Sequence, residues 1–383
     1  MSIEIVIFWT CVLLLAYAHL GYAALIAVRA LLSPRRPGRR GGEPTVSLLI
    51  VAHNEATRIA QRIQNLLTLD YPRDHLEILL ASDGSTDGTP ERARVHESAG
   101  VTVIAFETRR GKPAVLNDVV PKARGEIVVL ADTRQKFETG TLRTLVGPFA
   151  DPRVGAVSGE LILNGDGGET RVGEGVEFYW HYEKFIRRNE SCVDSTVGAT
   201  GAIYALRREL FEPIPEDTIL DDVLIPMRVV RRGYRVLFEA GARAYDRPAA
   251  TASEEFTRKV RTIAGNFQLF AHDCWLLNPF RNRLWLQTVS HKGLRLLSPL
   301  FLAAIFGTNL LLLGQWSYRC TLGVQIVFYA AALIGCASQN SRRKIPLLGI
   351  PYVFCLLNWA TAVAFVRFIT GRQRVTWEKA VKA

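Results

Sequence analysis

The chain has 383 residues, 49% of them hydrophobic, and a formal net charge of +11. This length and hydrophobic content allow one large soluble domain together with membrane helices. The six cysteines show no metal-ligand spacing, so no zinc or disulfide framework is visible. The basic balance does not indicate binding to nucleic acid, because the arginines cluster beside apolar runs and no nucleic-acid-binding motif accompanies them.

The N-terminal segment contains an uncharged apolar run, Ile5–Val28, close to the roughly 20 residues that cross a bilayer. We therefore expect residues 1–28 to form a retained transmembrane helix. A cleaved signal peptide is the alternative, but no basic n-region precedes the run and no small-residue cleavage site follows it. Residues 29–44 are a Pro- and Gly-rich basic linker, whose arginines place this end of the helix in the cytoplasm by the positive-inside rule.

A strand, a helix and a second strand follow the linker. The β-branched run Val46–Val51 stops at a polar turn that contains Asn54 and Glu55, and the run Leu76–Ala81 ends next to Asp83. Ligands of open α/β sheets bind outside the carboxyl ends of the strands. Asn54, Glu55 and Asp83 are therefore expected to face one crevice.

The alternation of strands and helices continues along the chain. Val101–Ala105 and Ile127–Leu130 read as further buried strands, with a helix around Val115–Val120 between them. This pattern predicts an α/β domain with a mostly parallel sheet, which we place at residues 45–270.

Six segments of this region, in this order, resemble the family 2 glycosyltransferases, in particular the membrane-bound branch that includes the cellulose, chitin, hyaluronan and poly-N-acetylglucosamine synthases. They are VAHNE at Val51–Glu55, SDGSTDGT at Ser82–Thr89, GKPAVLN at Gly111–Asn117, DTRQ at Asp132–Gln135, GATGAIYALRRELF at Gly198–Phe211 and LDD at Leu220–Asp222. The resemblance implies a nucleotide-sugar-binding fold of the GT-A type and the transfer of a sugar from a nucleotide sugar.

The resemblance also implies the residues that bind the donor. Asp83 matches the family's base-binding aspartate, with Asn54 and Glu55 beside it, although Asp83 could instead cap the following helix. Lys112 has the charge to lie by the diphosphate, and Asn117 closes the same wall. A solvated lysine and an amide inside a helix are the alternatives for these two residues.

The metal site is where the sequence departs from the family pattern. Asp132 matches the first carboxylate of Asp-x-Asp, but Arg134 replaces the second and cannot ligate a cation. Mg²⁺ or Mn²⁺ could still be held by Asp132 and phosphate oxygens, because Mg²⁺ commonly takes one or two protein carboxylates. Alternatively, the guanidinium of Arg134 neutralises the leaving diphosphate.

An inverting transfer needs a carboxylate that takes the proton of the acceptor hydroxyl. Asp221 and Asp222 resemble the family's acidic pair, whose second member is the base, so we assign Asp222 as the base and Asp221 to the acceptor side. An acidic first turn of a helix is the alternative. Gly201 resembles part of the family's acceptor loop, although a glycine turn into a strand is a common structure.

A further basic segment occupies the place of the Gln-x-x-Arg-Trp motif of the processive synthases. Arg261 matches the arginine that would meet the diphosphate, Arg258 stands in place of the glutamine on the acceptor side, and Thr262 stands in place of the tryptophan. The missing aromatic ring removes one surface for stacking on an acceptor sugar. Chain extension is therefore left open.

The C-terminal part returns to the membrane. We expect interfacial helices at residues 271–295, a transmembrane region of two or three spans at 296–370 and a basic tail at 371–383. The uncharged runs are Leu296–Tyr318, Cys320–Ser341 and Ile345–Val366. Three spans would put the C-terminus outside, whereas the basic residues of the tail favour the inside. Pro346, Pro351 and Asn358 make the third run, Ile345–Val366, the expected re-entrant or irregular segment.

These observations predict a multi-pass protein of the inner (plasma) membrane with a cytoplasmic catalytic domain. Its expected activity is the inverting transfer of a sugar, carried by UDP, to a lipid-linked or saccharide acceptor. Two alternatives stay open: a processive polysaccharide synthase coupled to export, and a non-catalytic subunit that binds a sugar nucleotide.

Overall fold

The structure is a computed structural model and describes residues 2–35, 38, 42–163, 171–247, 251–338 and 348–373, without the side chains of 171–178 and 252. The chain divides into two compact units, which we describe separately. The sheet unit comprises the described residues of Arg29–Asn164 and Arg187–Arg247. The helical unit comprises Met1–Val28, Gly165–Ile186 and Pro248–Gln373.

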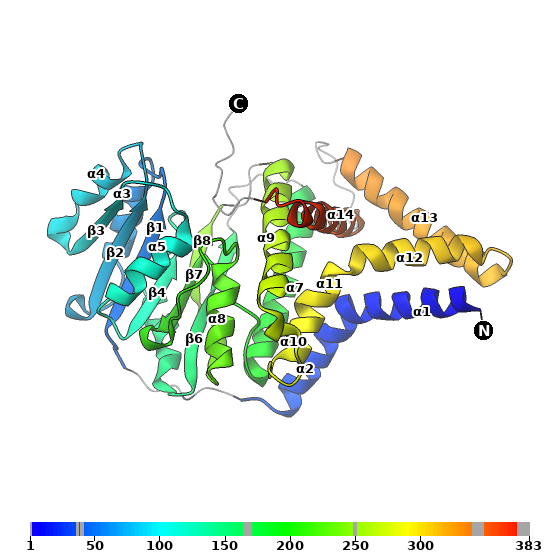
Figure 1. The fold of residues 1–383 in the computed structure, drawn as a ribbon, viewed down its shortest axis with the longest axis horizontal. Helices are drawn as coiled ribbons and strands as arrows, with labels where there is room; N and C mark the ends of the chain where they lie inside the picture. The colour runs from blue at the N-terminus through cyan, green and yellow to red at the C-terminus, as the bar shows by residue number, and fades with distance from the viewer. Residues whose placement is uncertain are drawn as a thin grey trace. The chain divides into compact units, whose positions relative to one another are not determined.

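The sheet unit is built on one eight-stranded sheet with the order β3-β2-β1-β4-β7-β6-β8-β5 (Figure 1). Its strands are β1 Val46–Ala52, β2 Leu76–Asp83, β3 Val101–Phe106, β4 Ile127–Ala131, β5 Lys136–Phe137, β6 Val154–Leu163, β7 Ile203–Arg207 and β8 Arg235–Asp246. Strands β3, β2, β1 and β4 are parallel, as the sequence predicts. Strand β7 runs antiparallel to both β4 and β6, and β8 runs parallel to β6.

The predicted α/β architecture is therefore confirmed, and the sheet is mixed beyond β4. The carboxyl ends of β1, β2 and β4 lie at one edge, because Ala52 pairs with Ser82 and Ile50 pairs with Ala131. Since β7 is antiparallel to β4, the start of β7 at Ile203 lies opposite Ala131 at that same edge. The loop that precedes β7 thus joins the strand ends that carry the polar motifs.

Short helices pack on the sheet. They are α3 Ile59–Leu67, α4 Thr89–Arg94, α5 Lys112–Val119, α6 Thr141–Val146 and α8 Asp221–Arg231. Helix α3 buries Ile59, Ile63 and Leu66 at helical spacing in the main core, as their periodicity predicts. Helix α5 begins at Lys112 itself, so the lysine lies in its first turn.

The helical unit consists of segments that are far apart in the sequence. Its helices are α1 Ile3–Ala16, η1 Tyr17–Gly21, the first part of α2 Tyr22–Leu32, the first part of α7 Arg171–Val193, α9 Ala252–His272, α10 Trp285–Gln287, η8 Thr288–Gly293, α11 Leu294–Leu296, α12 Ser298–Leu311, α13 Trp316–Ala337 and α14 Gly349–Ile369. Helix α1 packs beside α12, and α9 packs beside α14 (Figure 1). Helix α9 was expected within the 45–270 domain, but its Val260 and Ala264 pack against Ala360 and Ala364 of α14.

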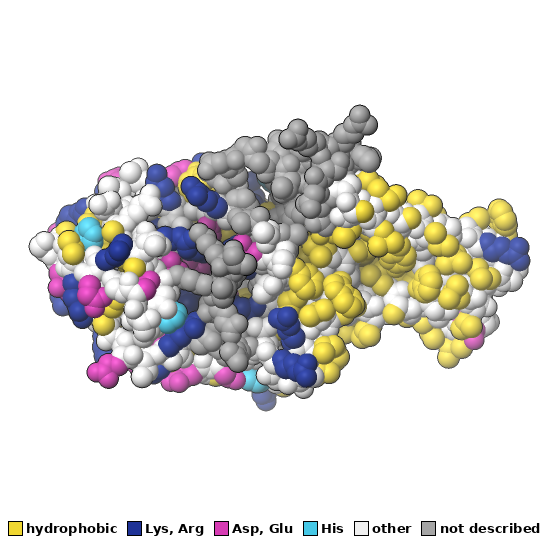
Figure 2. All heavy atoms as spheres, turned by 90° about the horizontal axis from the view of Figure 1, so that it is seen from above, with side chains coloured by type: hydrophobic (Ala, Val, Ile, Leu, Met, Phe, Trp, Pro, Cys, Tyr) yellow, Lys and Arg dark blue, Asp and Glu magenta, His cyan; other side chains and the backbone are white. Residues whose placement is uncertain are grey.

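Three helices of the described residues are long and apolar enough to cross a membrane: Ile3–Leu32, Trp316–Ala337 and Gly349–Ile369. A fourth candidate is the pair Trp285–Leu296 and Ser298–Leu311, which is bent by 56°. Large apolar side chains such as Leu13, Leu311 and Leu333 are mostly exposed on these helices. Figure 2 shows apolar side chains over most of one face of this unit, as lipid contact requires.

The helix boundaries differ from the expected spans at two places. The run Leu296–Tyr318 is divided, because α12 ends at Leu311 and a turn leads into α13. Residues 339–347 lie outside the described residues, and α14 is a continuous helix rather than an irregular segment. Pro351 is tolerated because it lies in the first turn of α14, where its missing N–H has no helical partner to lose.

The helical unit also contains a buried ionic cluster that the sequence did not predict. The carboxylate of Glu183 on α7 lies 2.9 Å from Nε2 of His291 and is ion-paired with Arg295. Arg295 also donates to the hydroxyl of Tyr182 at 3.1 Å, and this hydroxyl donates to the backbone carbonyl of His19 at 2.6 Å. His291 lies in the segment 271–295 that was expected to form interfacial helices, and its side chain is fully buried.

Candidate active site

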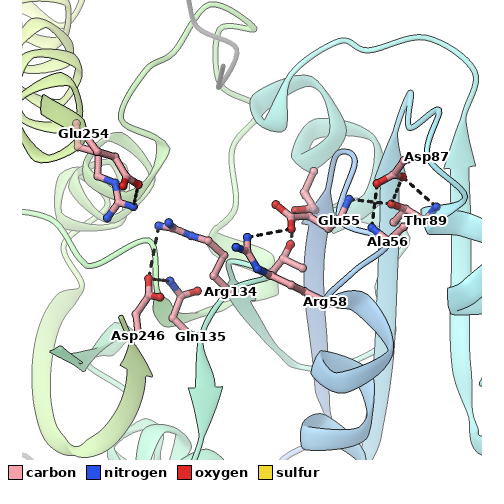
Figure 3. A network of polar contacts seen from close by, with 12 residues as sticks. Glu55, Ala56, Arg58, Asp87, Thr89, Arg134, Gln135, Asp246 and Glu254 are labelled. Atoms are coloured by element: carbon pink, nitrogen blue, oxygen red, sulfur yellow. Dashed lines mark hydrogen bonds and ion pairs between the residues drawn. The ribbon is translucent and has the colours of Figure 1, made fainter. Parts of the chain in front are cut away.

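The loops after β1 and β2 hold each other through polar contacts (Figure 3). The side chain of Asn54 accepts a hydrogen bond from the backbone of Thr86 at 2.8 Å, and its backbone has a positive φ of 54°. The backbone N–H of Glu55 donates to Thr89 at 2.8 Å, and the next N–H donates to Asp87 at 3.0 Å. Asn54 and Glu55, both predicted to bind the donor, thus shape the rim of the strand ends.

Asp83 is buried at the end of β2 and binds the backbone of the loop before α5. Its two carboxylate oxygens accept hydrogen bonds from the N–H groups of Arg110 at 2.7 Å and Gly111 at 2.8 Å. It does not cap the helix that follows β2, because the N-cap position of α4 is Gly88. Each oxygen retains a lone pair for a further donor.

Lys112 joins two of the predicted acidic residues. Its ammonium lies 3.2 Å from the carboxylate of Asp132 at the end of β4 and 3.0 Å from that of Asp221 at the start of α8. Burial lowers the pKa of this ammonium, but the charges of Asp132, Asp221 and Asp222 outweigh burial and raise it. Lys112 is therefore a fixed cation among three carboxylates and not a solvated surface lysine.

Asp222 lies next to the loop that precedes β7. Its Oδ2 accepts a hydrogen bond from the N–H of Gly201 at 2.9 Å, and its backbone carbonyl accepts one from Ala199 at 2.7 Å. Burial, followed by the charge of Asp221, raises the pKa of Asp222 to about 6, while Lys112 and Arg187 act in the opposite direction. A carboxylate with a pKa near 6 is a stronger proton acceptor than an ordinary surface aspartate.

The structure also brings two residues without a predicted role, Tyr204 and Arg187, close to the acidic residues. Tyr204 on β7 is fully buried, and burial together with the charges of Asp221, Asp222 and Asp132 raises the pKa of its hydroxyl. Arg187 on α7 is close enough to act on Asp222 electrostatically. Tyr204 lies in a family-like segment, which was the available signal, whereas nothing in the sequence around Arg187 marked it.

Asn117 holds the chain before α8. Its amide donates to the carbonyl of Ile214 at 2.7 Å and accepts from the N–H of Ile214 at 2.9 Å. Both ends of the side chain are thus committed to one buried backbone unit. This geometry indicates that Asn117 fixes the segment that leads to Asp221 and Asp222.

Arg134 is ion-paired with a carboxylate at the end of β8. One of its terminal nitrogens lies 3.5 Å from the carboxylate of Asp246, which also accepts a hydrogen bond from Gln135 at 2.9 Å (Figure 3). Arg134 is a half-buried cation two residues from Asp132. It occupies the position of the second carboxylate, as noted from the sequence.

A comparison with known protein families identifies the family of the sheet unit. Residues 47–214 match the model described as Glycosyl transferase family 2. The chain carries a family 2 glycosyltransferase domain. Asp221 and Asp222 lie just beyond the matched residues, and they contact Lys112 and Gly201, which lie within them.

Two curated relatives and one solved structure extend the comparison of the glycosyltransferase domain. A β-monoglucosyldiacylglycerol synthase from Nostoc sp. is 34% identical over 122 residues, which are 31% of this chain and 26% of the relative. A poly-β-1,6-N-acetyl-D-glucosamine synthase from Staphylococcus aureus is 22% identical over 233 residues, 60% of this chain and 56% of the relative. The matches thus span only about a quarter to just over half of the relatives' length.

The solved structure is that of the mannosyltransferase PcManGT from Pyrobaculum calidifontis, in complex with GDP-Man and Mn²⁺. The superposition covers 95% of this chain and 99% of the mannosyltransferase chain, with 24% sequence identity and a TM-score of 0.72. This likeness shows the fold, and the expected GT-A fold is confirmed.

The donor set of the glycosyltransferase domain fits a divalent cation only in part. No group of three or more His, Cys, Asp or Glu residues that could hold a metal ion occurs among the described residues. The carboxylate of Asp132 is partly exposed and shares one oxygen with Lys112. It would hold Mg²⁺ or Mn²⁺ as the one protein carboxylate, with phosphate oxygens as the remaining ligands.

Two predicted site residues lie in the helical unit. Arg258 and Arg261 are on α9, and Arg258 is ion-paired with Glu254 one turn earlier on the same helix. Lys259 lies 4.5 Å from the ring centroid of Tyr179 on α7. The structure brings together Lys112, Asp132, Asp221, Asp222 and Gly201 in the sheet unit, and it describes the α9 arginines separately.

Proposed function

We propose that the protein is a membrane-bound inverting glycosyltransferase. It moves a sugar from a nucleotide sugar, with UDP as the expected carrier, to a lipid-linked or saccharide acceptor. The observation that carries this proposal is Asp222, a buried carboxylate whose pKa is raised to about 6. It lies beside Gly201 and within the field of Lys112, which binds both Asp132 and Asp221. A base and a cation for the leaving group are thus found in one cluster.

In the proposed reaction an acceptor hydroxyl attacks C1 of the donor sugar from the side opposite the diphosphate. The new bond forms between the acceptor oxygen and C1 while the bond from C1 to the diphosphate oxygen breaks. The acceptor's proton passes to the carboxylate of Asp222, and the nucleoside diphosphate leaves with the bonding electrons. Lys112 is placed to stabilise the developing negative charge.

The other site residues bind and orient. Asp83 is held rigidly by two backbone N–H groups at the end of β2, and it is the proposed contact for the donor base, with Asn54 and Glu55 at the rim. Asp221 and Arg258 are proposed on the acceptor side, and Arg261 on the donor side. Asn117 acts through Ile214 by fixing the segment before α8.

We propose that Mg²⁺ or Mn²⁺ is held by Asp132 together with the donor diphosphate. When bound, such a cation neutralises the phosphate oxygens. Turnover that is unchanged in excess chelator would contradict this proposal and would favour the protein's own cations, Lys112 and Arg134, at the diphosphate.

We propose a multi-pass location in the inner (plasma) membrane with the sheet unit in the cytoplasm. The apolar helices and the arginines in the last turn of the first of them and beyond it, such as Arg29 and Arg35, support this orientation. The exposed Cys274 and Cys320 provide a test. In sealed vesicles of known orientation, each single-cysteine variant should react with an impermeant maleimide from one side only, and sheet-unit sites introduced as controls should react from the cytoplasmic side.

A lipid-linked acceptor is favoured over a growing polysaccharide. The polar side chains of the C-terminal helices bond to neighbouring helices or to their own: Thr321 donates to Asn309 at 3.2 Å, and Asn358 donates to the carbonyl of Phe354 at 2.9 Å. These contacts use polar groups that a polymer path would need. The relatives named above include both a glycolipid synthase and a polysaccharide synthase by name.

The deciding experiment measures donor turnover. The full chain in lipid is offered UDP-, GDP- and dTDP-sugars with a membrane extract, and nucleotide release and product size are followed. Release by the wild type and its loss in Asp222→Asn, with donor binding retained, support the proposal. A long product would identify a processive synthase. Binding without release in the wild type would favour the non-catalytic sugar-nucleotide-binding subunit.

A further inference from the structure

Arg62 on α3 is a buried cation that no motif of the domain includes. The residue is 3% exposed, and its guanidinium carbon lies 4.0 Å from the ring centroid of Phe137 on β5. Its Nη1 donates a hydrogen bond to Oδ1 of Asn65 at 3.0 Å. Its Nε and Nη2 are also buried, and neither has a hydrogen-bond partner among the described residues.

The residues next to Arg62 fix the end of the segment that begins at Asp132. Asn65 donates to the carbonyl of Phe137 at 2.9 Å and accepts from the N–H of Phe137 at 2.8 Å. The same Oδ1 of Asn65 also accepts from Arg62, so the arginine sets the orientation of the amide. Arg62, Asn65 and Phe137 thus form a clamp on the chain that carries Asp132 and Arg134.

The charge of Arg62 also acts on Asp132. Burial lowers the pKa of the guanidinium to about 9, and Asp132 opposes that shift, so the two charges interact across the interior. A buried guanidinium with two unused donors is unfavourable for folding, and an apolar side chain of similar length would avoid this cost. The two unpaired donors of Arg62 are thus a cost to folding that its contacts with Asn65 and Phe137 have to offset.

We propose that Arg62 is a positioning residue for donor binding, which fixes the Asp132 segment through Asn65 and Phe137 and supplies a buried positive charge to this part of the domain. The inference rests on the proposed function, because Asp132 is there assigned to the donor. It adds a residue from α3 to a site otherwise formed by strand ends, loops and the first turns of α5 and α8. The role is distinct from catalysis, since Arg62 acts through Asp132.

The test compares Arg62→Met and Arg62→Lys with the control variant Arg207→Met, whose arginine lies at the opposite end of the strands from Asp132. Arg207 lies 5.5 Å over the ring of Phe149, and it pairs with Ile127 at the start of β4, whereas Asp132 follows the end of β4. Its guanidinium donates to the carbonyl of Val154 at 2.9 Å. Like Arg62→Met, Arg207→Met therefore removes both a contact with a phenylalanine ring and a hydrogen bond. Each variant of the full chain in lipid is measured for the Kd of UDP and of the donor, for donor KM and kcat, and for Tm.

We expect Arg62→Met to weaken nucleotide-sugar binding at least tenfold and to raise donor KM by a similar factor, with a smaller change in kcat and a Tm equal to or above that of the wild type. Arg62→Lys should recover part of the affinity, and Arg207→Met should lower Tm without changing KM. An Arg62→Met protein that binds the donor as tightly as the wild type, or that loses affinity only in step with Tm as Arg207→Met does, would overturn the inference.

The outcomes separate this inference from the proposed function. A wild type that binds a nucleotide sugar but releases no nucleotide would contradict the proposed activity, while the Kd comparison would still decide the role of Arg62. A wild type that binds none of the UDP-, GDP- or dTDP-sugars would overturn both.

Discussion

The N–H of Gly201 donates to Oδ2 of Asp222 at 2.9 Å, and a Cβ added to Gly201 would lie 3.3 Å from that same oxygen. The Cβ would also lie 3.7 Å from Asp132, so it would enter the space between the proposed base and the proposed donor carboxylate. Gly201 does not have a positive φ that alanine would strain. The glycine is therefore explained by the space that it leaves between two carboxylates.

Gly201→Ala is accordingly expected to lower kcat/KM at least tenfold while leaving Tm within a few degrees of the wild type. Gly140→Ala is the matched control, because an added Cβ there meets no atom within 4 Å. Steady-state kinetics and thermal unfolding of both variants check the expectation. Equal activity of the two variants would show that the space beside Asp222 is not used by a substrate.

The raised pKa of Asp222 predicts the acidic limb of the pH profile. A base acts only when deprotonated, so kcat/KM should fall as the pH drops below about 6. Asp221→Asn removes a like charge that raises the pKa of Asp222, and it should move this limb to lower pH. Rates measured from pH 4.5 to 8 for both proteins test this, and a limb that stays at the same pH in Asp221→Asn contradicts the assignment.

Lys112→Met should move the same limb in the other direction. Lys112 lowers the pKa of Asp222, so its removal raises that pKa and shifts the acidic limb to higher pH. The variant also leaves Asp132 and Asp221 without their shared cation, and UDP should bind at least tenfold more weakly. Isothermal titration with UDP and a pH–rate profile measure the two effects, and an unchanged Kd would exclude Lys112 from the diphosphate site.

Asp222→Asn should stabilise the fold at neutral pH although it removes activity. The folded pKa of about 6 lies above the ordinary value of 3.8, so the contribution of this group to stability is fully present below about pH 4 and is lost as the pH rises through 6. Replacing the ionised group should add about 1 to 3 kcal/mol at pH 8. Tm values at pH 8 and pH 4 are the measurement, and a stabilisation that does not shrink toward pH 4 would contradict this origin.

Asn117→Ala should lower both stability and turnover. It removes two hydrogen bonds and leaves the buried backbone of Ile214 with unsatisfied groups, at a cost of about 2 kcal/mol. Donor affinity should change less than kcat if the residue acts on the chain before Asp221 rather than on the nucleotide. A change confined to the donor Kd would instead support a direct contact.

The strands and the polar residues at their ends were predictable because each strand is a continuous β-branched or aliphatic run. Val46–Val51 and Ile127–Leu130 extend by a single residue in the structure. The antiparallel direction of β7 was not predictable, because an isolated run such as Ile203–Leu206 carries no signal for direction. The placement of Asp132 and Asp222 near Gly201 depends on that direction.

The side-chain partners inside the site were harder to predict than its location. Lys112 and Asp222 followed from motif and chemistry, but the commitment of Asn117 to Ile214 depends on a contact across 97 residues. No role was predicted for Arg62, since the burial of an arginine cannot be inferred from spacing. The burial of His291 was not predictable either, because its partner Glu183 is 108 residues away in the sequence.

The ionic cluster of Glu183, His291 and Arg295 limits where the gene can be shortened. A fragment ending near residue 270, chosen to obtain the catalytic part without its C-terminal helices, would keep Glu183 and lose both side chains that bind its carboxylate. A carboxylate left alone in an apolar interior is strongly destabilising. A soluble fragment for crystallisation or screening would therefore need Glu183 replaced by an apolar residue, or it would have to retain the chain through Arg295.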